Sequence, residues 1–127
     1  MFVGDVESGI YYNITNTPND SETDPSFSPV RDEIAFAKVV SRVDIFRMPA
    51  LIGGTPTQVT TKSNTSTTQN LYPSWSPNGN EVLFAGLSNA ILAVRDVFRI
   101  STAPKAKAVK IAPPHEGHHW STPFQRN

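Results

Sequence analysis

The feature that most constrains the fold of this chain is a pattern that occurs twice. Three segments recur in the same order, namely PSFSP (25–29) as PSWSP (73–77), EIAFA (33–37) as EVLFA (81–85), and DIFR (44–47) as DVFR (96–99). The second copy carries four additional residues before its last segment. Self-similarity of this kind is typical of repeat architectures, in which each unit stacks on its neighbours and insertions fall in loops.

Short strands are the elements that the sequence predicts within each copy. Eleven prolines and seven glycines divide the chain into pieces that exclude long helices. The pieces between them are alternating or apolar and rich in β-branched and aromatic residues, as strands are. They are Glu33–Lys38, Val43–Met48, Glu81–Ala85 and Asp96–Ile100. An all-β fold is therefore predicted, while Leu87–Val97 fits either a helical turn or a lengthened hairpin.

Composition narrows the class of protein further. The 127 residues allow one domain, and 38% hydrophobic with 17% charged residues are enough for a packed core. The 11 basic and 11 acidic side chains cancel, which disfavours nucleic acid as a partner. Cysteine is absent from the sequence, which excludes disulfides and thiolate metal sites. No apolar run reaches the roughly 18 to 20 residues of a membrane span, so membrane insertion is not expected, and Met1–Ile10 does not resemble a signal peptide.

The two ends of the chain resemble incomplete copies of the repeat. Phe2–Gly9 followed by Tyr11–Thr15 is similar to Phe46–Gly54 followed by Thr57–Thr60. Within a single domain spanning 1–127 we therefore expect the last two strands of a unit at 1–15, complete units at 25–60 and 73–112, and the opening strand of a further unit at 118–124.

The opening and closing motifs of the units carry a resemblance to a known family. Trp75-Ser76-Pro77-Asn78-Gly79 opens one unit, and Gly53-Gly54 with Val59-Thr60 closes the other. This pattern resembles the TolB-type, WD-like β-propeller repeat, although Val30-Arg31 replaces its turn in the first copy. The positions that would carry the repeat are Phe27, Ser28, Pro29, Phe36, Asp44, Phe46, Gly53, Gly54, Trp75, Ser76, Pro77, Gly79, Phe84, Asp96, Phe98 and Trp120.

The resemblance implies β-propeller blades, each a four-stranded antiparallel sheet. The count of roughly eleven strands makes two to three blades, whereas closed propellers have four to eight. We therefore expect an incomplete ring in a single chain, and either a homo-oligomer or a fragment of a longer propeller. The equivalent aromatic residues, Phe36 with Phe84 and Phe46 with Phe98, are expected to face the adjacent blade.

Few residues suggest site chemistry. His115, His118 and His119 are weak candidates for metal ligands, because their spacing matches no known ligand pattern and follows two prolines. The acidic stretch Asp20–Asp24 is expected to be a solvated loop between blades, since it lacks the spacing of a calcium loop. No nucleophile motif is present, so we assign no catalytic residue, cofactor or metal.

The function implied by the resemblance is a non-catalytic protein–protein interaction module, with loops and channel presenting the binding surface in a periplasmic or extracellular setting. Two alternatives stay open. One is the gating propeller of a prolyl-oligopeptidase-like serine peptidase. The other is a sugar- or metal-binding propeller that uses residues 115–120.

Overall fold

Ten strands make up the regular structure that the computed structural model describes, which covers residues 1–4, 7–15 and 20–111. They are β1 (Phe2–Gly4), β2 (Tyr11–Asn13), β3 (Ser21–Phe27), β4 (Glu33–Val39), β5 (Val43–Pro49), β6 (Thr57–Gln58), β7 (Asn70–Trp75), β8 (Glu81–Asn89), β9 (Val94–Ser101) and β10 (Val109–Lys110). None of these residues belongs to a helix that is long and apolar enough to cross a membrane.

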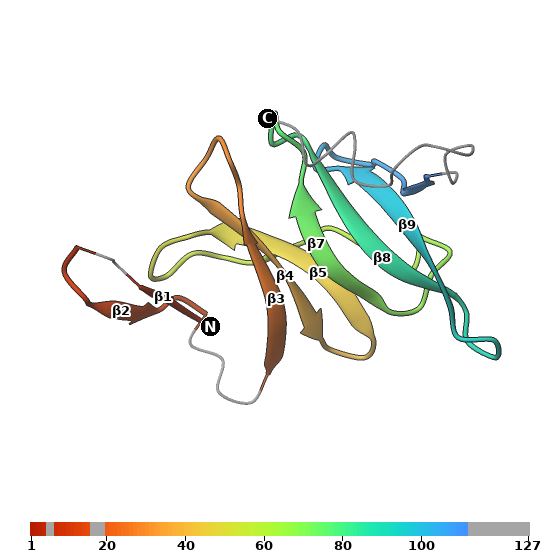
Figure 1. The fold of residues 1–127 in the computed structure, drawn as a ribbon, viewed down its shortest axis with the longest axis horizontal. Coiled ribbons are helices and arrows are strands. Elements are labelled where there is room, and N and C mark those ends of the chain that lie inside the picture. Colours follow the sequence, from red (N-terminus) through yellow and green to blue (C-terminus); the bar gives the residue numbers. More distant parts are fainter. Residues whose placement is uncertain (5–6, 16–19, 112–127) are drawn as a thin grey trace, which may run out of the picture.

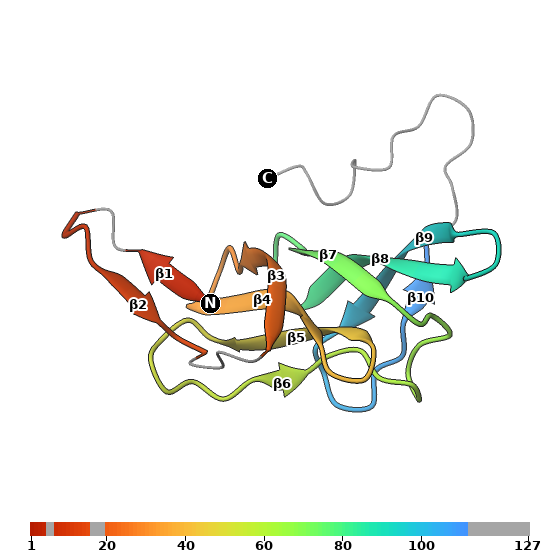
Figure 2. The same ribbon diagram turned by 90° about the horizontal axis from the view of Figure 1, so that it is seen from below.

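The strands form three antiparallel units that lie side by side (Figure 1). The N-terminal hairpin is β1–β2, the first sheet is β3-β4-β5-β6, and the second sheet is β7-β8-β9-β10. Seen from below, the same order runs from β1 and β2 at one end to β8–β10 at the other (Figure 2). Two four-stranded antiparallel sheets, with no helix in the described ranges, confirm the predicted all-β fold.

The two sheets share one register, as the repeat requires. Phe36 pairs with Phe46 across β4 and β5, and Phe84 pairs with Phe98 across β8 and β9. Each first strand also contains a bulge at the equivalent place. The bulges hold Asp24 at φ 56° and Tyr72 at φ 57°, in the left-handed region that side chains disfavour. The bulge is thus part of the repeat, although the sequence did not predict it.

The first sheet is buried on both faces, and the two faces differ in composition. Large side chains cover the face toward the N-terminal hairpin, where they pack with Ile14; they are Ile34, Phe36, Phe46 and Met48. Smaller ones cover the face toward the second sheet, namely Ala35, Ala37, Ile45 and Val59. From the second sheet, the residues that pack against this face are Trp75, Val82, Phe84, Phe98 and Ile100. In both sheets the aromatic pair therefore points toward the unit that precedes it in the chain.

The turn after each opening strand also follows the repeat. The Ser76 hydroxyl accepts a 3.0 Å hydrogen bond from the backbone nitrogen of Glu81, and Gly79 adopts φ +73°. A Cβ at Gly79 would meet Val30 Cγ2 in the loop after β3, so the close approach adds to the positive φ in favouring glycine here. In the first copy, the Ser28 hydroxyl accepts from the backbone nitrogens of Val30 and Arg31 instead.

The ambiguous stretch Leu87–Val97 is a lengthened hairpin. Strands β8 and β9 pair as far as Asn89 and Val94, and a turn joins them. The tip holds Ile91 and Leu92 at 94% and 71% exposure. The additional residues of the second copy therefore project beyond the sheet (Figure 1).

The prediction that Asp20–Asp24 forms a solvated loop is wrong, because all but the first of these residues lie in strand β3. β3 begins at Ser21, before the expected boundary at Pro25, and pairs with β4 over Ser21–Thr23. Asp20 forms a 2.9 Å ion pair with Lys38, and Glu22 accepts hydrogen bonds from Thr15 and the N-terminal amine. These carboxylates have protein partners, so the stretch is structural.

Candidate functional site

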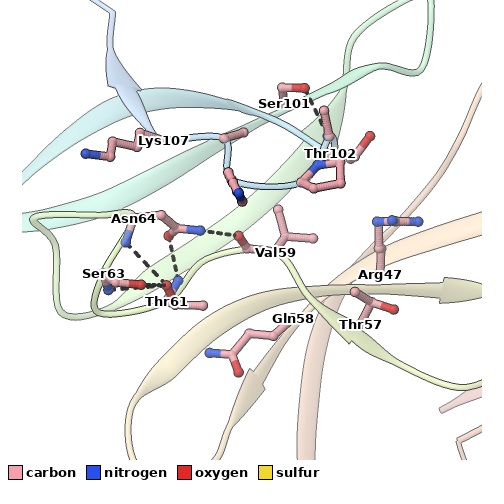
Figure 3. Close-up of a pocket in the computed structure, with 14 residues that line it drawn as sticks. Arg47, Thr57, Gln58, Val59, Thr61, Ser63, Asn64, Ser101, Thr102 and Lys107 are labelled. Atoms are coloured by element: carbon pink, nitrogen blue, oxygen red, sulfur yellow. Dashed lines mark hydrogen bonds between the residues drawn. The ribbon is translucent and has the colours of Figure 1, made fainter.

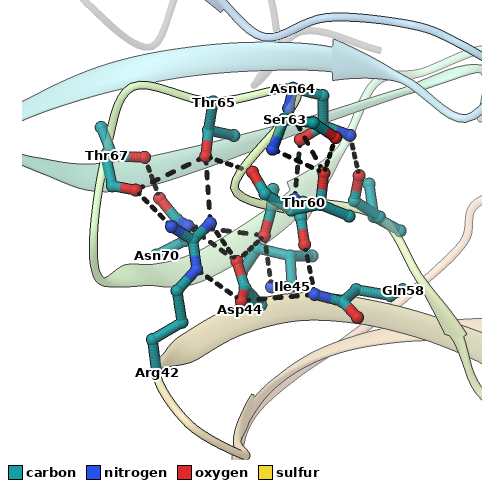
Figure 4. Close-up of polar contacts among 12 residues, drawn as sticks. Arg42, Asp44, Ile45, Gln58, Thr60, Ser63, Asn64, Thr65, Thr67 and Asn70 are labelled. Carbon is teal, nitrogen blue, oxygen red and sulfur yellow. Dashed lines mark hydrogen bonds and ion pairs between the residues drawn. The ribbon is translucent and has the colours of Figure 1, made fainter.

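A buried polar junction forms where the first sheet, the segment after it and the second sheet meet (Figure 4). Its centre is the carboxylate of Asp44, which is 4% exposed. Arg42 donates to it twice at 2.8 Å, from Nε and from Nη2, and the Thr60 hydroxyl donates at 2.7 Å. Bidentate geometry of this kind makes a strong, oriented pair. Hydrogen bonding to Asp44 raises the pKa of Arg42 above its ordinary value, against a smaller opposing effect of burial.

The second sheet reaches the same carboxylate through Asn70, the first residue of β7. Asn70 Nδ2 donates to Asp44 Oδ1 at 3.1 Å, and the Thr67 hydroxyl donates to Asn70 Oδ1. Gln58 adds a 3.3 Å bond to Asp44 Oδ2. A Cβ at Gly86 of β8 would lie 2.7 Å from Thr67 Cγ2, so a glycine makes room for these side chains. Because a carboxylate accepts about four hydrogen bonds, these donors saturate the Asp44 carboxylate. Since the donors come from both sheets, the junction joins the two sheets.

The segment Thr60–Asn70 has the polar, low-complexity composition of a linker, but several of its side chains belong to the junction. Thr60, Thr67 and Asn70 are buried, with 0 to 1% exposure. Arg42 Nη1 donates to the Thr67 carbonyl at 2.9 Å, and its Nη2 donates to the Thr65 hydroxyl at 3.1 Å. The threonines and asparagine in this segment are therefore selected by hydrogen bonding across the junction.

Asp96 is the counterpart of Asp44 in the second sheet, and its surroundings differ. Val94 stands where the first sheet has Arg42. Asp96 is half-buried and accepts from the Ser88 hydroxyl, and Lys110 Nζ lies 3.4 Å away. The Ser88 hydrogen bond is the main cause that lowers the pKa of Asp96, and Lys110 lowers it further.

A pocket of about 680 Å³ lies between the first sheet and the loop after β9 (Figure 3). One wall comes from Arg47, Thr57, Gln58, Val59, Thr61, Ser63 and Asn64, and the other from 101–107. Three cations and no carboxylate belong to the lining; the cations are Arg47, Lys105 and Lys107. Arg47 lies 3.3 Å from Glu33 Oε2. In the part of the chain that the structure describes, Lys105 and Lys107 form no ion pair.

The walls of this pocket are held by hydrogen bonds within the protein. Asn64 Oδ1 accepts from the backbone nitrogen of Thr61 at 2.7 Å, and Asn64 Nδ2 donates to the Val59 carbonyl at 2.9 Å. The Asn64 carbonyl accepts from the backbone nitrogen of Ala108 at 2.8 Å, which links the two walls. The pocket is therefore formed before any ligand arrives. The sequence did not point to it, because its lining comes from two polar loops of different units.

The described phenylalanines of the repeat pair in the same register in the two sheets, but the surroundings of several other repeat residues differ between the copies. Trp75 is buried and its Nε1 donates to the Ser26 carbonyl at 2.9 Å, whereas Phe27, its counterpart, is 57% exposed. Gly53 adopts φ +82° in the turn before β6. The candidate metal ligands His115, His118 and His119, together with Trp120 and the expected strand 118–124, lie outside the described residues. Within 1–4, 7–15 and 20–111, no group of three potential metal ligands occurs.

Comparisons with known proteins bear on the fold. No protein-family model matches the chain, and no curated protein matches it. A solved structure described as putative TolB from Agrobacterium tumefaciens superposes on it with a TM-score of 0.61 and 18% sequence identity. The superposition covers 77% of this chain and 32% of that one, so the chain spans about a third of the length of the TolB structure. At this identity the likeness shows the fold alone. With its two four-stranded sheets, the chain has a TolB-like, propeller-type fold.

Proposed function

We propose that this chain is a non-catalytic protein–protein interaction module and that the pocket between its two sheets binds an acidic segment of a partner protein. The observation that carries the proposal is the pocket lining, in which Lys105 and Lys107 stand beside hydroxyl and amide groups with no carboxylate among them. A carboxylate that enters the pocket would gain charge-assisted hydrogen bonds from these side chains.

The size and construction of the pocket support the same proposal. A volume of about 680 Å³ lies within the usual range for ligand sites, roughly 300 to 1,000 Å³. Its walls are loops held by a two-sheet scaffold, the usual location of binding residues. Thr57, Ser63 and Thr102 supply hydroxyl groups that can bond to a peptide backbone, whereas the Thr61 hydroxyl is already bonded within its own loop.

The test is a binding titration with a fluorescently labelled peptide rich in aspartate and glutamate. Its control peptide carries asparagine and glutamine at the same positions. We expect the acidic peptide to bind more tightly, and we expect this binding to weaken with added salt because exposed charges are screened. The double variant Lys105→Glu with Lys107→Glu should weaken binding about tenfold, since each exposed ion pair contributes up to about 1 kcal/mol.

The matched control is Lys62→Glu. It reverses one charge, half of the change in the double variant, between the pocket-lining residues Thr61 and Ser63, at an exposed side chain that does not itself line the pocket. It should leave the affinity within about twofold of the unchanged protein. Equal binding of the acidic and amide peptides, or an unchanged affinity in the double variant, would refute the proposal. A neutral oligosaccharide that displaces the peptide would point to the sugar-binding alternative.

A further inference from the structure

The outer face of the second sheet has the same construction as a face that the first sheet buries. The repeat aligns Ala35, Ala37, Ile45 and Val59 with Leu83, Ala85, Val97 and Ile111. The backbone agrees, because the Val59 nitrogen donates to the Ile45 carbonyl at 2.7 Å and the Ile111 nitrogen donates to the Val97 carbonyl at 2.8 Å. These two rows are therefore the same face of the same kind of sheet.

The two faces differ in what covers them. The four residues of the first sheet are buried, with exposures from 0 to 7%, because the second sheet packs on them. Leu83, Ala85, Val97 and Ile111 keep intermediate exposure. Among the described residues, no further sheet packs on this face. It is an apolar surface, and it is equivalent to the face of the first sheet that packs against the second sheet.

The opposite end of the molecule presents the complementary feature, an exposed aromatic ring. Val3 of β1 packs against the core of the first sheet, and neighbouring side chains on a strand point to opposite faces. Phe2 therefore points away from the first sheet, and it is 66% exposed. Phe46 and Phe98 occupy the equivalent position on β5 and β9, and each packs against the unit that precedes it. Phe2 has no such unit to pack against among the described residues.

We infer that the outer face of the second sheet binds the N-terminal hairpin of a second copy of this chain, with Phe2 packed against Ala85 and Val97. The fit follows the interface inside the molecule, where Phe84 and Phe98 pack toward Ala35 and Ala37. The hairpin of the second copy would contribute one aromatic ring, Phe2, where the internal interface has two, Phe84 and Phe98. Leu83, the larger counterpart of Ala35, would fill part of the space of the missing ring.

The two surfaces are different, which determines the kind of assembly. Each copy that binds a neighbour through one surface still exposes the other, so the contact is heterologous and continues until a ring closes or a filament forms. The inference goes beyond the proposed function, since neither surface includes the pocket between the two sheets.

Sedimentation velocity of the full chain, from low to high micromolar concentration, tests the inference. We expect the mass of the unchanged protein to rise with concentration. Phe2→Asp and Val97→Asp should each stay monomeric, because each removes one surface. The control is Ile91→Asp, which places the same charge on the exposed hairpin tip and should associate like the unchanged protein. Circular dichroism establishes that each variant is folded.

Mixing the two variants makes the experiment specific to a heterologous contact. Phe2→Asp keeps the sheet face and Val97→Asp keeps the hairpin, so an equimolar mixture should form dimers of one copy each and go no further. If Val97→Asp does not fold, Ala85→Asp replaces it. An unchanged protein that is monomeric at every concentration would overturn the inference. Association of Phe2→Asp to the same extent as the unchanged protein would overturn it as well.

Discussion

Phe84 stacks on Phe98 with ring centroids 5.6 Å apart and an interplanar angle of 16°. In the first sheet, Phe36 stacks on Phe46 in the same way, at 6.1 Å and 20°. Both pairs lie directly across two neighbouring strands. Each pair therefore stabilises its own sheet as a cross-strand contact. It also provides the apolar surface that packs against the neighbouring unit.

Phe84→Ala should lower the free energy of unfolding by about 3 to 5 kcal/mol, because it removes a fully buried ring and leaves a cavity between the sheets. Urea denaturation followed by tryptophan fluorescence measures the change. Phe27→Ala removes the same side chain from an exposed position and should cost within about 0.5 kcal/mol. Equal effects of the two substitutions would contradict the assignment of Phe84 to the interface between sheets.

Asp44→Asn should lower the free energy of unfolding by about 2 to 4 kcal/mol, since it leaves Arg42 without its charged partner in a buried junction. Asp96→Asn is the matched control at the equivalent position of the second sheet. Its partners are more exposed, so it should cost less stability than Asp44→Asn. Thermal unfolding of the two variants side by side gives the comparison, and a larger loss from Asp96→Asn would contradict the role of the junction.

Tyr72→Gly should leave stability unchanged or raise it by up to about 1 kcal/mol, although it removes a large side chain. The left-handed backbone costs a non-glycine residue roughly 1 to 2 kcal/mol, which exceeds the roughly 0.5 to 1 kcal/mol of added entropy cost for glycine. Tyr72 is 62% exposed, so little packing is lost. Ser74→Gly on the same strand lacks the positive φ and should be destabilising. The midpoints of denaturant unfolding compare the stability of the two variants, and a clearly lower midpoint for Tyr72→Gly than for the unchanged protein would refute the prediction.

Ser88→Ala should raise the pKa of Asp96 toward its ordinary value, because the Ser88 hydroxyl is the main group that stabilises its ionised form. Lys110→Ala should raise this pKa as well, because Lys110 also favours the ionised form. Because the folded-state pKa is lowered, ionised Asp96 contributes stability at pH above the unfolded-state value, and this contribution is lost as pH falls through the folded-state pKa. A carboxyl-detected NMR titration measures the pKa values, and an unchanged pKa of Asp96 in Ser88→Ala would be the contrary result.

The sequence predicted the strands of the repeat well, because EIAFA and EVLFA fix both the register and the face of each side chain. The opening strands were harder. The first four residues of β3, Ser21–Asp24, are polar, so the sequence favours a loop there. They form a strand because they pair with β4. The hairpin over Leu87–Val97 was left open, because a short apolar run does not reveal its own period.

The junction and the pocket could not be predicted from the sequence, because neither has a local pattern. Thr67 and Asn70 lie in a run of threonine, serine and asparagine that also fits a solvated linker. Their partners Arg42 and Asp44 lie far away in the chain, and only the packing of the two sheets brings the four together. Lys105 and Lys107 line the pocket together with residues of the first sheet for the same reason.

The unlike faces of the first sheet, large rings on one side and alanines on the other, have a consequence for how such a gene can grow. Each unit carries both halves of the contact that it makes with its neighbours. Tandem duplication of the DNA that encodes one unit would supply a new neighbour already shaped to fit, with no compensating substitution. Genes of this kind can gain or lose whole units in evolution while every surviving contact stays the same.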